Sequence, residues 1–337
     1  MTGRRVLIVG DSRETHVGHH LLDAARTLGI AAQIADTSAA YRASNLRRRV
    51  LWHLAGHRPA RLRPFGDEVV AAARAMQADT VIATGIAPLT AETLKTLGRL
   101  GIRRMNFLTD DPWNRAHRAP WFLSALPRYD HVWSPRHAVL HDLRRAGVRR
   151  VDYLAFGYNP AVHYPEIPDD ETRARFDADV VLAGGADRDR IPWVAPLIGA
   201  GFRVALYGGY WHRYGVTRRR AGGVLDAQGL RFATTTARVS LGIVRRANRD
   251  GHAMRSYEVP AMGGCLLAER TSDHERLFGR DGDAVLYAAT PAEAVTRVRW
   301  LLAHPDDRDR MVTTGRHLIA AGHHTYADRL AVMLEAS

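Results

Sequence analysis

Cysteine is nearly absent, since Cys265 is the single one among 337 residues. Because a disulfide joins two cysteines, an intrachain disulfide framework is excluded, and the apolar neighbours of Cys265 predict a packed thiol in a reducing compartment. Long hydrophobic runs are also missing: no apolar stretch approaches the ~20 residues of a membrane-spanning helix. No signal peptide is expected, because the first residues lead directly into the apolar run Val6–Gly10. We therefore expect a cytoplasmic protein.

The fingerprints of several binding functions are absent too. Gly10 and Gly18 lie too far apart for the Gly-x-Gly-x-x-Gly turn of a dinucleotide site, which disfavours a dehydrogenase. There is no helix-turn-helix pairing, zinc-ligand spacing or aromatic RNA-reading motif, so nucleic acid stays a minor hypothesis. The adjacent Asp110 and Asp111 are too few ligands for a dedicated metal site, and we expect no metal.

Acidic residues are too few to balance the basic ones. Lys and Arg number 48 against 35 Asp and Glu, which gives a formal net charge of +13. Local clusters of basic residues occur at Arg47–Arg49, Arg58–Arg63, Arg144–Arg150 and Arg218–Arg220. Such a charge attracts anionic substrates, acidic lipid head groups or nucleic acid, and an arginine-rich composition without a function explains it as well. Residues 37–64 predict a basic amphipathic helix and a loop. This segment is solvated, covers a ligand cleft or lies on an anionic surface.

The remaining pattern alternates short apolar runs with helical periodicity, which predicts an α/β fold of Rossmann-like domains. About six strands are expected in each half, and the length is sufficient for two cores. Residues 159–178 are rich in proline and acidic residues and predict a linker. We therefore expect two domains, over 1–158 and 179–320, and a last helix over 321–337.

Ligands of open parallel sheets gather at the carboxyl ends of the strands, so polar residues after strands are site candidates. In the first half these are His16, after the first strand, and Asp110 and Asp111, after the strand that starts at Arg104. Each carboxylate is a candidate to bind acceptor hydroxyls or to act as a base. A solvated loop explains His16 equally, and an Asx turn or helix cap before Pro112 is the alternative for the aspartates.

The second half offers candidates for binding a nucleotide. A strand from Asp179 runs into a glycine-bearing loop whose Arg190, or else Arg188, supplies charge for a leaving diphosphate. After the next strand, Gly208 lets the backbone approach a base, and Tyr210 lines the base pocket or packs in the core.

Residues 250–278 organise this half. We expect a helix from Arg255 to Met262, a diglycine turn, a strand over Cys265–Ala268 and a second helix near Ser272, with Arg245 close by. The expected helix places its first turn, with free N–H groups, toward a ligand. Its candidate donor-binding residues are Arg255, Ser256, Tyr257 and Glu258. Asp250 and Glu258 lie about two helical turns apart and so reach opposite ends of an elongated ligand, such as a sugar nucleotide.

These residues also carry a resemblance. Arg255-Ser-Tyr-Glu-Val-Pro-Ala-Met-Gly-Gly264, with Glu269-Arg-Thr and Leu277-Phe278, resembles the C-terminal signature of the CgeB-like (spore-maturation type) glycosyltransferases. The similarity extends over about residues 104–335, including Thr109-Asp-Asp-Pro-Trp113 and the closing His-Thr-Tyr326. It implies the GT-B fold, in which two Rossmann-like domains face each other across a cleft. By this resemblance residues 1–158 are the acceptor domain, residues 179–320 are the nucleotide-sugar donor domain, and the helix over 321–337 crosses back to the N-terminal domain.

The resemblance also implies roles. Glu258 matches the second of two glutamates separated by seven residues in related retaining enzymes, where it holds the nucleotide ribose. Asp250 stands in place of the first glutamate, which contacts the sugar, and its shorter side chain is a departure from that pattern. Arg190 matches the arginine of the phosphate loop.

The leading hypothesis is a glycosyltransferase that moves a sugar from a nucleotide-sugar donor, with retention and with neither metal nor cofactor. The acceptor is open and is a small molecule, glycan, lipid or protein. The alternatives are a catalytically silent nucleotide-sugar-binding protein, a GT-B sugar-nucleotide epimerase and a basic nucleic-acid-associated protein. An anionic membrane surface, on the inner membrane face, remains an open partner.

Overall fold

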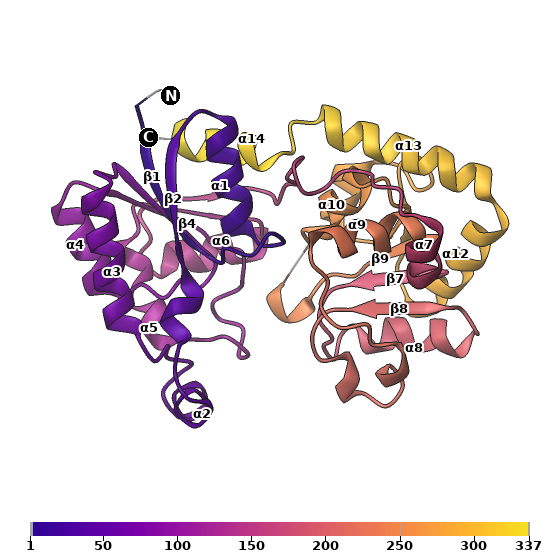
Figure 1. Ribbon diagram of the computed structural model, residues 1–337, viewed down its shortest axis with the longest axis horizontal. Helices are drawn as coiled ribbons and strands as arrows, with labels where there is room; N and C mark the ends of the chain where they lie inside the picture. Colours follow the sequence, from indigo (N-terminus) through magenta and orange to yellow (C-terminus); the bar gives the residue numbers. More distant parts are fainter. Residues whose placement is uncertain (1–2, 250, 336–337) are drawn as a thin grey trace. The chain divides into compact units, whose positions relative to one another are not determined.

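The computed structural model describes residues 3–249 and 251–335, which form two compact units (Figure 1). Unit 1 contains residues 1–155, 247–249 and 326–337, and unit 2 contains residues 156–246 and 250–325. The chain therefore passes between the units four times. The short piece Ala247–Arg249, far along the chain, belongs to the N-terminal unit.

The described part of unit 1 holds a six-stranded parallel sheet in the order β2-β1-β3-β4-β5-β6. The strands are β1 (Arg5–Gly10), β2 (Ala31–Asp36), β3 (Thr80–Thr84), β4 (Arg103–Phe107), β5 (His131–Ser134) and β6 (Val151–Tyr153). Val6, Leu7, Ile8 and Val9 of β1 are all buried, because a parallel strand with helices on both faces has no solvent side. The continuous apolar run in the sequence reflects this double burial.

The helices of unit 1 pack on this sheet or extend from it. They are α1 (Val17–Thr27), α2 (Asn45–Leu54), α3 (Leu62–Ala75), α4 (Ala91–Arg99), α5 (Pro120–Leu123), α6 (His137–Arg145) and α14 (Tyr326–Glu335). Helix α14 packs on α1, and the ring of Tyr326 stacks on the buried His20 with centroids 5.0 Å apart. Arg329 also donates to the carbonyl of Ala155 at 3.0 Å. The last helix is thus an integral part of the N-terminal unit.

Unit 2 holds a five-stranded parallel sheet among its described residues, in the order β11-β10-β9-β7-β8. The strands are β7 (Val180–Ala183), β8 (Val204–Tyr207), β9 (Val239–Gly242), β10 (Leu266–Glu269) and β11 (Leu286–Ala288). The helices are α7 (Asp170–Phe176), α8 (Ile191–Gly199), α9 (Ala227–Thr236), α10 (Arg255–Ala261), α11 (Ser272–Phe278), α12 (Pro291–Ala303) and α13 (Pro305–Ala321).

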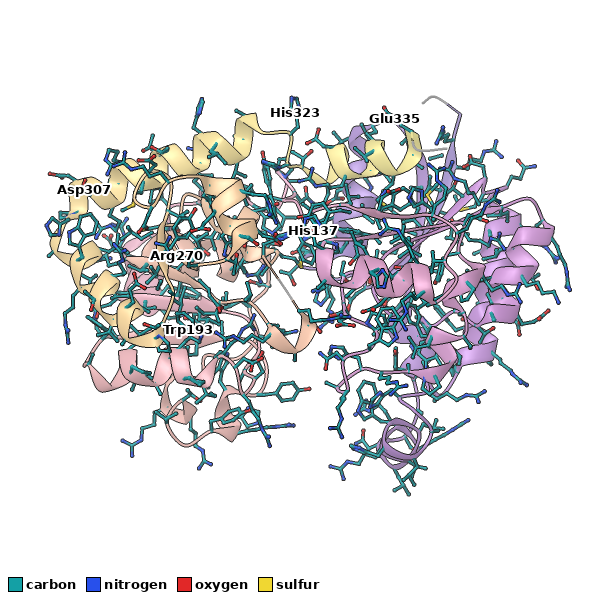
Figure 2. The ribbon with its side chains drawn as sticks, turned by 180° about the vertical axis from the view of Figure 1, so that it is seen from behind. His137, Trp193, Arg270, Asp307, His323 and Glu335 are labelled. Carbon is teal, nitrogen blue, oxygen red and sulfur yellow. The ribbon has the colours of Figure 1, made fainter. Side chains whose placement is uncertain are left out.

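Both faces of the second sheet are covered, as β7 shows. Val180 and Leu182 join a core with α8 and α12, whereas Val181 joins a second core with α7 and α9. Successive side chains of a strand point to opposite faces, so alternate residues enter different cores. Trp193 of α8, labelled in Figure 2, is buried in the first of these cores.

Two expectations need correction. Unit 2 has five strands in its described residues, not about six. The segment expected to be a linker contains α7, which is capped by the Asp169 side chain and anchored by the buried Phe176. Residues 37–64, expected to form a helix and a loop, contain a 3₁₀ turn, helix α2 and the start of α3 at Leu62.

Among the residues described, no helix combines the length and apolar character that crossing a membrane requires.

Candidate functional site

The strand order of unit 2 locates its ligand-binding edge. From β7 the chain moves to β8 on one side, and then returns to β9 on the other side of β7. The connections after β7 and β9 therefore diverge, which places a topological switch point at the carboxyl ends of these two strands. Residues 184–190 follow β7 and residues 243–246 follow β9. A candidate site in unit 2 belongs here.

Glycines bring the loops after β7 and β8 into close contact. Gly208 has a φ of +123°, and a Cβ on it would lie 2.6 Å from the carbonyl of Gly184. The Gly184 N–H donates to the carbonyl of Tyr207 at 2.7 Å, and the Ala186 N–H to that of Gly209 at 2.8 Å. Only glycine combines this backbone conformation with such an approach. Gly208 therefore shapes the loop after β7, and its approach to a base stays a prediction.

Arg190 has a different environment from the one expected of a phosphate-binding residue. Its side chain is buried, and its Nη1 and Nη2 donate to the carbonyls of Gly185 at 2.8 Å and Ile243 at 3.2 Å. These two carbonyls belong to the loops on either side of the switch point. The guanidinium thus joins the loop after β7 to the loop after β9. Nη1 and Nη2 of Arg190 are thus engaged with backbone carbonyls, and its role as a diphosphate ligand stays a prediction.

Two other arginines present charge at the same edge. Arg188 is exposed at the tip of the loop after β7. Arg245, in the loop after β9, has its Nε 3.4 Å from a carboxylate oxygen of Asp187, and its side chain is 40% exposed. The sequence placed Arg245 only near the organising stretch. Its position two residues after Ile243, on the other side of the switch point, identifies it as a site candidate.

Helix α10 contributes a buried ion pair. Glu258 is 0% exposed and accepts a hydrogen bond from Arg255, whose Nε donates to the carbonyl of Ala183 at 3.1 Å. The other carboxylate oxygen of Glu258 lies 3.5 Å from Nε2 of the buried His163. Burying a carboxylate is costly unless it is paired. Glu258 therefore fixes Arg255 at the carboxyl end of β7, while the Arg255 side chain remains 26% exposed.

Ser256 and Tyr257 are committed to the interior of unit 2. The Ser256 N–H donates to the carbonyl of Ala253 at 3.0 Å, and its hydroxyl lies 2.7 Å from Nε2 of His274. Tyr257 is buried, with the ring of His252 at 5.6 Å. The expectation that Ser256 offers a free amide to a diphosphate is therefore corrected, because one more turn of backbone precedes α10 and uses that N–H.

His274 explains why this interior network is neutral. Its Nδ1 lies 2.7 Å from the carbonyl of Glu269, which accepts a hydrogen bond from Nδ1–H, so Nε2 accepts a hydrogen bond from the Ser256 hydroxyl. Burial disfavours the charged ring and lowers the pKa of His274 to about 4.

Tyr210 lies at the surface. Its side chain is 53% exposed and its ring lies under the guanidinium of Arg213, 4.2 Å from the centroid. The backbone of Tyr210 has a φ of +74°, and the tight turn after β8 positions its ring. The structure leaves Tyr210 accessible rather than packed in the core.

In unit 1, the expected candidates follow strands at the carboxyl edge. The side chain of His16, at the start of α1, is 39% exposed, and its Nε2 lies 3.0 Å from Arg13 and 3.6 Å from Asp11. Arg13 pairs with Asp11 at 2.5 Å, and this pairing lowers the pKa of the Asp11 carboxyl although burial opposes the shift. The first loop thus carries an accessible group of two basic side chains and one acidic one.

Asp110 and Asp111 follow β4 but have different surroundings. Asp111 is buried: it accepts from the Trp113 N–H at 2.9 Å, as in an Asx turn, and from Nε of Arg249 at 2.6 Å. Asp110 is half-buried and accepts from Asn248 at 3.3 Å. Asp111 therefore has a structural environment, and Asp110 is the more accessible carboxylate.

The partners of these aspartates were not foreseen. Asn248 and Arg249 come from the short piece of unit 1 that lies far along the chain. Arg249 also pairs with Asp142 at 2.7 Å, and its hydrogen bonds to the two carboxylates raise its pKa. Asp250, the remaining candidate catalytic residue, lies outside the described residues.

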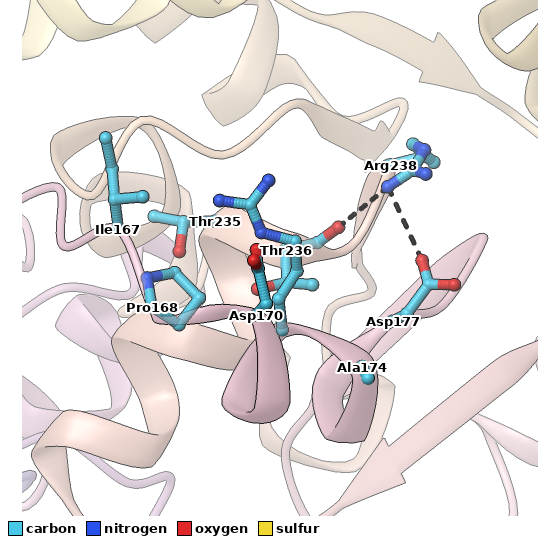
Figure 3. Close-up of a pocket in the computed structure, with 9 residues that line it drawn as sticks. Ile167, Pro168, Asp170, Ala174, Asp177, Thr235, Thr236 and Arg238 are labelled. Atoms are coloured by element: carbon cyan, nitrogen blue, oxygen red, sulfur yellow. Dashed lines mark hydrogen bonds and ion pairs between the residues drawn. The ribbon is translucent and has the colours of Figure 1, made fainter.

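A cavity of about 560 Å³ opens elsewhere on unit 2 (Figure 3). It is lined by Ile167, Pro168, Asp170, Arg173, Ala174, Asp177, Thr235, Thr236 and Arg238. Arg238 precedes β9 and Asp177 precedes β7, so the cavity lies at the amino ends of the strands. It is therefore at the opposite edge of the sheet from the candidate site.

Comparisons with known proteins agree with this geometry. Residues 190–335 match the family model described as "Glycosyl transferase-like". No curated protein sequence matches the chain. The structure resembles sucrose-phosphate synthase from Thermosynechococcus elongatus, with 13% identity and a TM-score of 0.65 over 99% of this chain and 98% of that chain.

Two further similar structures are described as complexes with a nucleotide or a nucleotide sugar. Anabaena HepE in complex with UDP has 12% identity and a TM-score of 0.62, over 99% of this chain and 100% of that chain. The UDP-GlcNAc 2-epimerase from Neisseria meningitidis bound to UDP-GlcNAc has 10% identity and a TM-score of 0.53, over 98% of this chain and 99% of that chain. With its two parallel sheets, the chain has the GT-B fold, as the sequence predicted.

Proposed function

We propose that this protein is a glycosyltransferase of the CgeB-like type that moves a sugar from a nucleotide-sugar donor to an acceptor, with retention and without a metal ion. One observation carries the proposal. The switch point of unit 2 gathers a glycine-rich loop, two arginines with exposed side chains and the Arg255–Glu258 pair. Most of this unit lies in the part of the chain that matches the glycosyl transferase-like family model.

The chemical step requires stabilisation of the leaving diphosphate. Negative charge builds on its oxygens as the bond to the anomeric carbon breaks, and guanidinium groups bind such oxygens with directed hydrogen bonds. In this proposal Arg188 and Arg245 supply that charge at the switch point. Arg190 acts as a positioning residue, because it holds the two loops that carry them.

Glu258 also acts first as a positioning residue. Its carboxylate is fully buried and holds Arg255, which is the more exposed member of the pair. The contact with a ribose that the resemblance implies is proposed for this pair as a unit, with Arg255 nearer to the solvent. Tyr210 remains a candidate for the base, since its ring is accessible.

The acceptor side is proposed to lie in unit 1, on the loops after β1 and β4. Asp110 and His16 are the accessible groups there, and either is suited to accept a proton from an acceptor hydroxyl. The acceptor class stays open among small molecules, glycans, lipids and proteins.

Product analysis tests the proposal. The full-length protein is incubated with a panel of nucleotide sugars, with and without mixed acceptors, and the products are followed by NMR. The proposal expects release of nucleoside diphosphate and a new α or β glycoside that keeps the donor's anomeric configuration. Inversion would contradict retention, and loss of activity with EDTA would contradict metal independence. Binding without any turnover would favour the silent nucleotide-sugar-binding alternative.

An epimerase is the second candidate. The structural match to a UDP-GlcNAc 2-epimerase favours it, because the same fold holds a sugar nucleotide there. The NMR experiment separates the two functions: an epimerase converts one nucleotide sugar into another in the absence of any acceptor.

A further inference from the structure

Helix α2 of unit 1 has no buried residue. Figure 1 shows it at the end of a loop, clear of the sheet of unit 1. A ten-residue helix is marginally stable in water on its own, and helices in proteins are normally stabilised by packing one apolar face. This helix has such a face, but no part of the described chain covers it.

The apolar face is a stripe along the helix. Leu46, Val50 and Leu54 are 74%, 46% and 82% exposed. They are four residues apart, so at about 100° per residue they span an arc of ~80°. Arg47 and Arg49 border this stripe on its two sides. Neither side chain makes a hydrogen bond or ion pair with any residue that the structure describes.

The charge around the stripe has one sign. Residues 37–66 contain seven arginines and no aspartate or glutamate, so this segment alone has a formal charge of +7. The whole chain has a formal net charge of +13. An apolar stripe between arginines matches the boundary of an anionic bilayer, where leucine side chains enter the acyl region and arginines reach the head-group phosphates. A solvated helix needs no leucines at these positions, and a partner bound only by charge would not contact them.

The helix is held firmly at its C-terminal end. His57, with a φ of +59°, has its Nδ1 2.9 Å from the carbonyl of Arg118, and its ring lies 4.5 Å from that of Trp52. A Cβ on Gly56 would lie 2.8 Å from Pro120, which shows how closely this turn approaches α5. The attachment fixes one end of α2 and leaves the Leu46–Leu54 stripe facing outward.

We propose that α2 docks unit 1 on an anionic lipid surface, with Leu46, Val50 and Leu54 inserted at the head-group boundary and Arg47 and Arg49 on the phosphates. This inference rests on α2 alone and is independent of the transferase chemistry.

The test uses the full-length protein and sedimentation with phosphatidylcholine vesicles, with or without phosphatidylglycerol. Binding to the anionic vesicles that falls with added salt is expected, and none to the neutral vesicles. Arg47→Gln with Arg49→Gln should weaken binding about fivefold for each arginine. Leu46→Ser with Leu54→Ser should weaken it at least about tenfold. No core side chain is changed, so the melting temperature should stay the same.

Matched controls come from unit 2. Arg219→Gln with Arg220→Gln removes the same charge from another exposed basic cluster, and Val224→Ser removes an exposed apolar side chain. Both should bind the anionic vesicles like the wild type. If the arginine control weakens binding as much as the α2 variant, the attraction is general and the proposal fails.

Insertion can be observed directly. Because Cys265 is buried, a cysteine introduced at the exposed Ala55 is labelled selectively with an environment-sensitive dye. The proposal expects a blue shift on anionic vesicles for this label and none for a label at Ala303, which is exposed at the end of α12.

Three further results would overturn the proposal. One is failure of the wild type to bind anionic vesicles. The second is concentration-dependent dimerisation that the Leu46→Ser, Leu54→Ser variant abolishes, with no vesicle binding, which would assign the stripe to a second copy of the chain. The third is binding to RNA or heparin as tight as to vesicles and insensitive to the leucine substitutions, which would assign α2 to polyanion binding.

Discussion

The ion pair between Arg249 and Asp111 makes a quantitative prediction about unit 1. The Asp111 side chain is 4% exposed, and its carboxylate lies 2.6 Å from Nε of Arg249. The substitution Arg249→Ala removes this charged partner. The substitution also removes the bond from Arg249 to Asp142 at 2.7 Å. The Asp111 carboxylate would then stay buried with only the Trp113 N–H as its donor among the bonds described above.

The magnitude follows from burial. Leaving one charge of a buried pair without its partner costs about 3–5 kcal/mol. Because the Arg249 side chain is 38% exposed, water already screens part of the attraction, and we expect about 2 kcal/mol. For a unit of this size, that corresponds to a fall of about 4–8 °C in melting temperature.

The assay is calorimetry of the full-length protein, in which the transition of unit 1 is followed separately because two units need not unfold together. Arg99→Ala is the matched control: this pair, with Glu92, is exposed on both sides, and we expect a change within about 0.5 kcal/mol. Hydrogen exchange should also be faster at the Trp113 amide in Arg249→Ala. Equal shifts for the two variants would refute the reasoning.

Three further predictions concern unit 2. Gly208→Ala should destabilise the protein by about 2 kcal/mol or more in urea unfolding, because φ is +123° and the Cβ would meet Gly184. Gly199→Ala is the control and should not destabilise the protein, since there is open space around Gly199. Equal effects of the two substitutions would contradict the loop geometry. His274 has a pKa of about 4 in the folded state against 6.5, so the unfolded state takes up a proton first as the pH falls. The free energy of unfolding should therefore fall by about 3 kcal/mol as the pH drops from 6.5 to 4. A wild-type stability profile that is flat over this range and matches that of His274→Gln would count against this. Cys265 should resist alkylation at pH 8 until the protein is unfolded, because burial raises the pKa of its thiol to about 12. Rapid alkylation of Cys265 in the native protein would disprove that burial.

Local sequence patterns predicted most of the strands and the helix–turn–strand around α10. Apolar runs such as Val6–Val9 have few alternatives to a doubly buried strand, and Gly263, with a φ of +77°, ends its helix as expected. Helix α7 was missed because its proline and acidic residues have linker composition. A signal was present, however: Asp169 caps the helix and Arg173 and Arg175 lie in its last turn.

The site was harder to predict than the elements that carry it. No local pattern indicates that Arg190 folds back onto Gly185 and Ile243, since the second contact joins residues 53 positions apart. The pairing of Arg249 with Asp111, 138 positions apart, was equally inaccessible. Such contacts depend on how distant loops meet, and local periodicity contains no information about them.

The most direct test of the donor-site assignment is calorimetric titration of nucleoside diphosphates and nucleotide sugars into the wild type and into Arg188→Gln, Arg245→Gln and Glu258→Gln. The account predicts micromolar binding of one nucleotide to the wild type, and at least about tenfold weaker binding to each folded variant, since each loses a charged group of the proposed site. Arg219→Gln should bind normally. Absence of nucleotide binding to the wild type, or equal binding to all variants, would contradict the proposed donor site at the switch point of unit 2.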